Sequence, residues 1–98
     1  MHSSTKVSFD YDGTLTKASA IRKAMDLVEK GITVYIISAR DSKEGMLKLA
    51  RRVGIPENHV YATGSNEAKI AKVKELGITT HYDNNIEVVR ALKGIGAI

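Results

Sequence analysis

The sequence predicts an α/β protein, a three-layer α/β/α domain with a central, mostly parallel sheet of about five strands. Short apolar runs rich in β-branched residues alternate along the chain with segments whose apolar residues recur every three or four positions. The connecting loops are short, which favours parallel strands covered by helices on both faces. A chain of 98 residues suffices for one domain with a modest core, so residues 1–98 are assigned to a single domain.

The first half of the chain is predicted to contain two strands separated by a helix. Residues 6–10 form a short strand that ends in an acidic loop, and residues 17–30 form a helix followed by Gly31. The inward face of this helix is predicted to consist of Ile21, Ala24, Met25 and Val28. Residues 32–37 are apolar enough for a strand that is buried on both faces.

The remaining elements continue the alternation. Residues 42–53 are predicted to form a second helix, whose inward side chains are Met46, Leu49, Ala50 and Val53. Residues 59–62 form a weaker third strand. A third helix at residues 67–76 turns Ile70, Val73 and Leu76 inward. The last elements are a strand at residues 78–82, a helix at 86–93 and a short fifth strand at 95–98.

Net charge and hydropathy limit the substrate class and the cellular location only slightly. The formal net charge is +4 and the pI is near 9.4, which suits an anionic substrate but does not identify nucleic acid, because surface lysines explain it as well. No apolar run approaches the roughly 20 residues of a membrane helix. The first five residues are polar and lack the apolar core of a signal peptide. We therefore expect no membrane association and a cytoplasmic location.

Neither cysteine nor histidine is expected to contribute catalytic residues or metal ligands. The chain has no cysteine, which excludes disulfides and cysteine metal sites. His59 and His81 stand near predicted strand ends. A lone histidine at such a place is more often a packing or surface residue than a ligand, so neither is given a catalytic role.

Acidic and hydroxyl side chains stand where the predicted strands end. Asp10 and Asp12 follow the apolar run Val7-Ser8-Phe9 in the order Asp-Tyr-Asp-Gly-Thr, Ser38 follows the second run, and Asp83 follows the fourth. Ligands of parallel α/β sheets bind beyond the carboxyl ends of the strands, so these side chains are expected to converge on one crevice. Taken alone, Asp-x-Asp-Gly is also a common turn pattern.

Together with a lysine in the next helix, this order of residues resembles the haloacid dehalogenase superfamily of phosphohydrolases. That superfamily carries a DxDGT motif, then Ser or Thr, then Lys, then acidic residues. The resemblance spans residues 6–98 and implies a Rossmann-like fold and Mg²⁺-dependent hydrolysis of a phosphomonoester. It implies that Asp10 is the nucleophile and forms an aspartyl-phosphate, and that Asp12 is the general acid and base. Two neighbouring like charges are expected to raise one pKa, which would help Asp12 hold a proton.

The resemblance also implies the residues that bind the substrate. Ser38 would donate a hydrogen bond to the phosphoryl group, and Thr14 belongs to the same motif as the two aspartates. Arg40, in Ser-Ala-Arg, is either a bidentate phosphate ligand or a solvated loop residue. Lys69 is preferred as the motif lysine, which neutralises charge on nucleophile and phosphate, because it lies closest to the start of its helix. Lys72 is the second choice.

The implied metal ligands for Mg²⁺ are Asp10, the backbone carbonyl of Asp12, and Asp83. Mg²⁺ prefers oxygen ligands and takes one or two carboxylates. The superfamily often has a second acidic residue in its last motif, where this chain has Asn84 and Asn85. That departure affects metal affinity more than the type of reaction. Either asparagine can also cap the following helix.

The predicted loops leave no room for a cap domain, so the site should be open. An open site suits a large phosphorylated substrate, or a small one shielded by another subunit of a homo-oligomer. The Ser-Ala-Arg sequence favours a nucleotide or polynucleotide-end phosphate. Two alternatives remain: a catalytically weak domain of this type that binds a phosphorylated partner or a protein, and a response-regulator-like phosphoacceptor domain. The latter class has its aspartate on a middle strand, whereas here the acidic pair follows the first strand.

Overall fold

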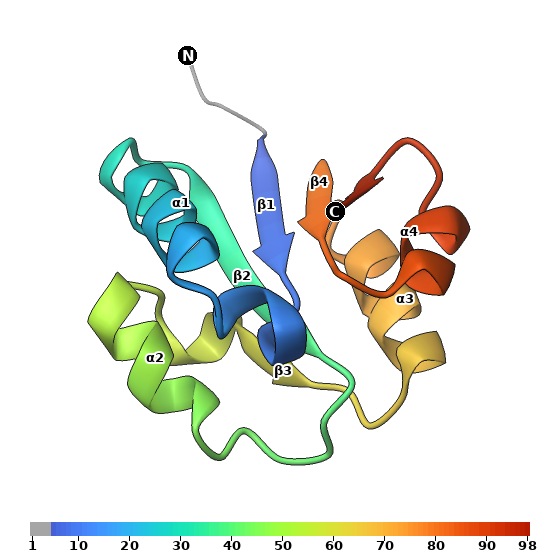
Figure 1. The fold of residues 1–98 in the computed structure, drawn as a ribbon, viewed down its shortest axis with the longest axis horizontal. Coiled ribbons are helices and arrows are strands. Elements are labelled where there is room, and N and C mark those ends of the chain that lie inside the picture. Colours follow the sequence, from blue (N-terminus) through green and yellow to red (C-terminus); the bar gives the residue numbers. More distant parts are fainter. Residues whose placement is uncertain (1–4) are drawn as a thin grey trace.

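The computed structural model describes residues 5–98. The strands are β1 (Lys6–Phe9), β2 (Thr33–Ser38), β3 (Val60–Ala62), β4 (Thr80–Tyr82) and β5 (Gly96–Ala97). The α-helices are α1 (Ala18–Glu29), α2 (Met46–Val53), α3 (Asn66–Glu75) and α4 (Ile86–Ala91). Within the described residues the strands form one parallel sheet in the order β3-β2-β1-β4-β5, and Figure 1 shows its arrangement with the helices. The predicted α/β fold is confirmed.

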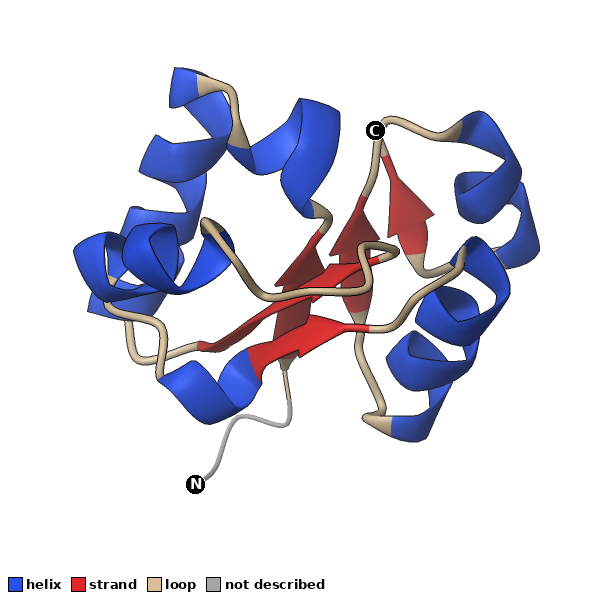
Figure 2. Cartoon of the chain, turned by 90° about the horizontal axis from the view of Figure 1, so that it is seen from below, coloured by secondary structure: helices blue, strands red, loops and turns tan. Residues whose placement is uncertain are grey.

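Helices cover both faces of the sheet and enclose two cores (Figure 2). Along β2, Val34 and Ile36 belong to the core beneath α1 and α2, whereas Tyr35 and Ile37 belong to the core beneath α3 and α4. This alternation follows from the pleat of a strand, which directs successive side chains to opposite faces. Because full burial of a large apolar side chain contributes roughly 1.5–3 kcal/mol, β2 is held strongly from both sides and fixes the middle layer.

Several element bounds differ from the prediction; the fourth strand, for example, begins at Thr80 and not at residue 78. Three further differences have a local cause. Met25 is 45% exposed. It lies about 100° around the helix from the buried Ala24, whereas Leu27 lies within about 60° of it and packs against the core instead. The second helix begins at Met46, not at residue 42, because Gly45 takes a φ of +83° directly before it. The third strand begins one residue later than predicted, because a single 3₁₀ turn, η2 (Glu57–His59), precedes it.

A wide helical turn, η1 (Tyr11–Leu15), directly follows Asp10. The Leu15 N–H donates to the Asp10 carbonyl at 3.3 Å and closes the turn. Gly13 lies inside it with a φ of +76°, and a Cβ added there would overlap the side-chain amide of Asn84. Glycine is therefore required at position 13 by the backbone conformation and by close packing.

The connections that could carry an inserted domain are short in the structure. Only η1 and α1 lie between β1 and β2, and only α2, η2 and β3 lie between β2 and α3. Among residues 5–98, no helix has both the length and the apolar character needed to span a membrane. The expectation about a signal peptide falls mainly on residues 1–4, outside the described part of the chain.

Candidate active site

A cavity of about 340 Å³ lies at the carboxyl ends of the central strands and gathers most of the predicted site residues. Asp10, Asp12, Ser38 and Lys69 all line it. Asp10 directly follows β1 and Ser38 is the last residue of β2, while Lys69 lies in the first half of α3. The expected convergence on one crevice is present for Asp10 and Ser38, whereas Asp83 lines a neighbouring cavity and Arg40 a third one. The cavity wall also includes Asn66, which was not predicted from the sequence.

A buried charge cluster joins two residues of this cavity, Asp10 and Lys69, to Asp83. The Lys69 Nζ lies 3.2 Å from Asp10 Oδ1 and 2.7 Å from Asp83 Oδ2. The side chains of Lys69, Asp10 and Asp83 are 3%, 8% and 0% exposed, respectively. Lys72 instead forms an ion pair with Glu75 at 3.1 Å, at the surface. Of the two lysines considered from the sequence, Lys69 is the one that meets the aspartates.

The cluster perturbs its two carboxyl groups in opposite directions. Burial raises the pKa of Asp10, and the charge of Asp83 adds to this, while Lys69 partly offsets it. Burial would also raise the pKa of Asp83, but hydrogen bonds from His81, Lys69 and the Asn85 N–H outweigh it and lower that pKa. Two carboxylates share one ammonium group, so one negative charge in the cluster is uncompensated.

Asp12 is held by Arg40. The Arg40 Nε donates to Asp12 Oδ2 at 2.8 Å, and Nη2 donates to Oδ1 at 2.9 Å, a bidentate pair in which both side chains are partly exposed. The hydrogen bonds from Arg40 lower the pKa of Asp12 below its ordinary value. The expectation that Asp12 has the raised pKa was therefore wrong. Burial raises the pKa of Asp10 instead, and Asp12 projects toward solvent, where it gains a cationic partner.

The loops around the cavity are fixed by local hydrogen bonds. The Ser38 Oγ accepts from the Arg40 N–H at 3.1 Å, which leaves its own proton free to donate. The Ser65 side chain caps α3 by accepting from the Ala68 N–H at 3.0 Å. Asn85 caps α4 by accepting from the Glu87 N–H at 2.9 Å, which confirms that an asparagine after Asp83 caps the helix.

Thr14 does not join the other predicted substrate-binding residues. It is buried and lines a second cavity of about 310 Å³, on the other side of Gly13 and Asn84. The rings of Phe9 and Tyr82, which stack with centroids 5.1 Å apart, also line this cavity. Its other lining residues include Lys17 and Lys23, and the Lys23 ammonium lies 4.5 Å from the centre of the Tyr82 ring.

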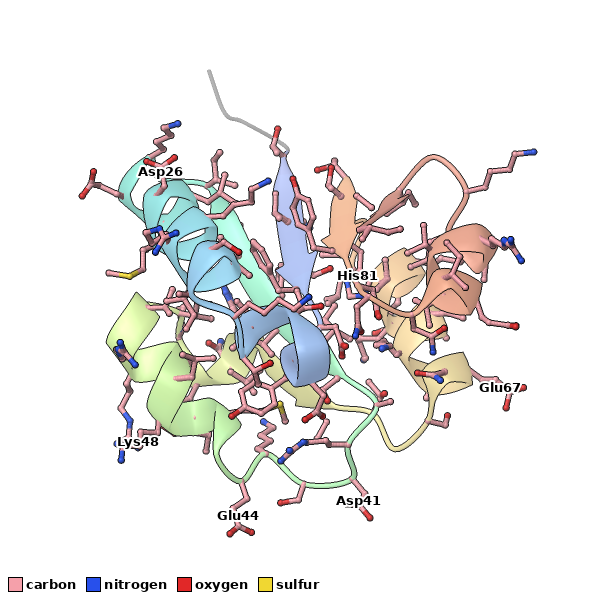
Figure 3. The ribbon with its side chains drawn as sticks, viewed as in Figure 1. Asp26, Asp41, Glu44, Lys48, Glu67 and His81 are labelled. Atoms are coloured by element: carbon pink, nitrogen blue, oxygen red, sulfur yellow. The ribbon has the colours of Figure 1, made fainter. Side chains whose placement is uncertain are left out.

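His81, which was given no catalytic role from the sequence, lies beside the charge cluster. It is fully buried, its Nδ1 lies 2.7 Å from Ser8 Oγ, and its Nε2 lies 3.0 Å from Asp83 Oδ2. Figure 3 shows it beside β4, inside the molecule, whereas Asp41 and Glu44 point outward. A signal was present, because residues two apart on a strand share one face, and His81 precedes Asp83 by two.

Two carboxylates of this site keep lone pairs that could bind a hard divalent cation. No group of three or more acidic, histidine or cysteine side chains arranged for metal binding occurs among residues 5–98. Mg²⁺ needs only one or two carboxylates and keeps several waters. Lys69 and His81 occupy both lone pairs of Asp83 Oδ2. The Asn85 N–H occupies one lone pair of Asp83 Oδ1, so one lone pair of Oδ1 remains. Asp10 has only Oδ1 engaged by a side chain in the described structure.

Comparisons with known proteins support the fold. No protein-family model and no curated protein matches the chain. A crystal structure of a hypothetical protein from Xanthomonas campestris matches with a TM-score of 0.60 and 22% sequence identity, over 93% of this chain. The match covers 61% of that protein, so the present chain corresponds to somewhat less than two thirds of its length. At this identity the likeness establishes the α/β architecture.

Proposed function

We propose that this protein is a phosphomonoester hydrolase of the haloacid dehalogenase type. The observation that carries the proposal is the buried Asp10–Lys69–Asp83 cluster at the carboxyl ends of β1 and β4. Burying two carboxylates and an ammonium costs stability unless each is well paired. Such an arrangement, at the floor of a cavity, is typical of a catalytic site.

In this proposal Asp10 attacks the phosphorus atom. An oxygen of its carboxylate forms a bond to phosphorus while the bond to the leaving oxygen breaks, which gives an aspartyl-phosphate. Lys69 holds Oδ1 of Asp10 at 3.2 Å and so orients the carboxylate. The Ser38 hydroxyl donates to a phosphoryl oxygen. Water then attacks phosphorus, and the bond to Asp10 breaks to release phosphate.

Asp12 moves the protons of both steps. It protonates the leaving oxygen in the first step and accepts a proton from the attacking water in the second. The ion pair with Arg40 favours the ionised form of Asp12, which can act as a base but not as an acid. We infer that a phosphate dianion draws the bidentate guanidinium away from Asp12, and that Asp12 then takes up a proton for the first step.

Asp10, the Asp12 carbonyl and Oδ1 of Asp83 would hold Mg²⁺. When bound, this ion supplies positive charge that offsets the repulsion between Asp10 and the phosphoryl group. Burial, with a smaller contribution from the charge of Asp83, raises the pKa of Asp10, and a cation bound beside it would stabilise its ionised form.

A nucleotide or polynucleotide-end phosphate is the substrate class that we propose. The cavity next to the site is lined by the partly exposed ring of Tyr82 and by two lysines, Lys17 and Lys23. Aromatic side chains stack on bases, and lysines attract further phosphates. Thr14 lines this cavity, so its proposed part in substrate binding would be played there.

The catalytically weak alternative is favoured by one observation, the Arg40–Asp12 ion pair, which opposes acid catalysis. The response-regulator-like alternative fits less well. Its sheet order is 2-1-3-4-5, whereas the order here is β3-β2-β1-β4-β5.

The test is turnover of a panel of phosphorylated nucleotides, oligonucleotide ends and small metabolites, with Mg²⁺ and with a chelator. We expect hydrolysis that needs Mg²⁺ and disappears in Asp10→Asn. Asp26→Asn is the matched control, because Asp26 is an exposed aspartate paired with Lys30 on α1, away from the strand ends (Figure 3). Full activity in Asp10→Asn would refute the mechanism, and phosphate binding without turnover would favour the weak alternative.

A further inference from the structure

A chain of buried hydrogen bonds runs from Ser8 in the interior of the sheet through His81 to Asp83. Ser8 on β1 and His81 on β4 are partners in the strand register, and both are 0% exposed. Ser8 Oγ lies 2.7 Å from His81 Nδ1, and His81 Nε2 lies 3.0 Å from Asp83 Oδ2. Each ring nitrogen therefore has one buried partner, and one of these partners is a proposed metal ligand.

The partners determine which nitrogen of His81 carries the proton. An ionised carboxylate only accepts hydrogen bonds, so His81 Nε2 must carry a hydrogen and donate it to Asp83. In a neutral imidazole the other nitrogen then accepts, and Ser8 can fill that role by donating its hydroxyl proton to Nδ1. The ionised Asp83 thus selects the Nε2–H tautomer, and Ser8 completes the hydrogen bonding of the ring in that form.

The consequence for Asp83 is a fixed choice of oxygen. Lys69 and His81 both approach Oδ2, at 2.7 and 3.0 Å, and fill its two lone pairs. Only Oδ1, which accepts from the Asn85 N–H at 2.9 Å, retains a lone pair. Without His81 the carboxylate would keep a vacant position on Oδ2 and a weaker restraint on its rotation.

We propose that His81 is a positioning residue of this site: supported by Ser8 at Nδ1, it holds Oδ2 of Asp83 through Nε2–H, so that Asp83 presents Oδ1 to the metal. The inference rests on the proposed function for its catalytic meaning, but the hydrogen-bond chain itself does not. Partners of metal ligands typically contribute 10–100-fold to metal affinity or activity, so the role has a measurable size.

The tautomer is tested first, by NMR of protein labelled with ¹⁵N and ¹³C in histidine. We expect His81 in the Nε2–H form. His59 is an internal reference, because its Nδ1 lies 3.2 Å from the Val34 carbonyl, which only accepts, so the neutral ring carries its proton on Nδ1. His59→Gln and His81→Gln assign the two signals. Finding His81 in the Nδ1–H form would overturn the proposal, whether or not the protein hydrolyses phosphate.

Substitutions then separate positioning from packing. His81→Gln keeps a side-chain donor, whereas His81→Leu fills a similar space without one. We expect the dissociation constant for Mg²⁺, measured by calorimetry on the protein alone, to rise about 10–100-fold in His81→Leu and far less in His81→Gln. Equal weakening in both variants, in proportion to lost stability, would mean that His81 only packs.

Ser8→Ala covers the case in which His81→Leu does not fold, since it deletes one hydroxyl and leaves the ring in place. It should leave His81 in the Nε2–H tautomer, because Asp83 still requires a donor, but weaken Mg²⁺ binding, because the ring loses its support at Nδ1. Unchanged Mg²⁺ binding in Ser8→Ala would contradict the assigned role of Ser8. If the parent binds Mg²⁺ and shows the expected tautomer but turns over no substrate, the proposed function fails while the positioning role stands.

Discussion

The two buried carboxylates around Lys69 should respond oppositely to the same chemical change. Asp10→Asn and Asp83→Asn each remove one negative charge and keep the shape of the side chain. Asp10 is the carboxyl whose charged form is disfavoured by burial, whereas the charge of Asp83 is stabilised by three donors. We therefore expect Asp10→Asn to stabilise the fold at neutral pH and Asp83→Asn to destabilise it.

The magnitudes follow from the contacts. Relieving an unfavourable functional charge commonly yields about 0.5–2 kcal/mol, which is the expected gain in Asp10→Asn. Asp83→Asn places an amide where Asp83 accepts from His81, Lys69 and the Asn85 N–H. Because a hydrogen bond to a charged group contributes about 1.5–3 kcal/mol, we expect a loss of at least that size.

The two effects also have different pH windows. The pKa of Asp10 is raised above its ordinary 3.8, so the parent loses stability as the pH rises from 3.8 through that raised pKa. The advantage of Asp10→Asn should be absent below this window and complete above it. The pKa of Asp83 is lowered, so its contribution is full above 3.8 and is lost as the pH falls through the lowered pKa.

Urea unfolding of the parent and both variants at a series of pH values, followed by far-UV circular dichroism, measures these differences. Thermal unfolding gives a second reading, since 1 kcal/mol shifts the midpoint of a domain of this size by about 4–8 °C. The reasoning is refuted if the two variants change stability with the same sign at neutral pH. It is also refuted if the gain in Asp10→Asn persists unchanged to the acid limit of the folded state.

Three further predictions concern neighbouring residues. Lys69→Met should lower the free energy of unfolding by about 3–5 kcal/mol at neutral pH, because it leaves buried carboxylates unpaired. The matched surface variant Lys72→Met should change the free energy of unfolding in urea little. Equal losses in both variants would contradict the pairing of Lys69 with the aspartates. Gly13→Ala should lower the free energy of unfolding by about 1–3 kcal/mol, because position 13 has a positive φ. It should also displace the Asn84 side chain and so shift the NMR signal of its side-chain amide. An unshifted signal would argue against the close packing of Gly13 and Asn84. Asp12→Asn should slow turnover about 10²–10⁴-fold. With a labelled substrate that has a good leaving group, it should nevertheless accumulate phosphate on Asp10, as measured by acid quench. Absence of label on the protein would contradict the proposed role of Asp12.

The site was predictable to the extent that it depends on strand ends. Asp10, Ser38 and Asp83 each follow an apolar run, and parallel strands bring their carboxyl ends to one edge of the sheet. Their positions follow from local apolar patterns and from the parallel arrangement of the strands. Lys69 was identified by its distance from the start of its helix, and the structure places it against both buried aspartates.

The contacts that could not be predicted join side chains that are distant in sequence. Arg40 and Asp12 are 28 positions apart, and their pairing depends on how two loops leave the sheet. The proximity of two acidic residues in the motif suggested a raised pKa for Asp12, but exposure and a cationic partner decide the sign. Local patterns also do not reveal the burial of single polar residues, so the contacts of His81 with Ser8 and Asp83 could not be predicted.

The charge arrangement links the metal to the substrate in the proposed mechanism. Arg40 neutralises Asp12, and Lys69 balances only one of Asp10 and Asp83, so the site starts with one unbalanced negative charge. A phosphate dianion adds two more, and Arg40 offsets one of them once it leaves Asp12 for the phosphate. In the proposed mechanism a divalent cation balances the two negative charges that remain, so linkage requires the cation and the phosphate each to strengthen binding of the other. Asn84 and Asn85 fit this balance, because an acidic residue at either position would add a further charge that the cluster could not compensate.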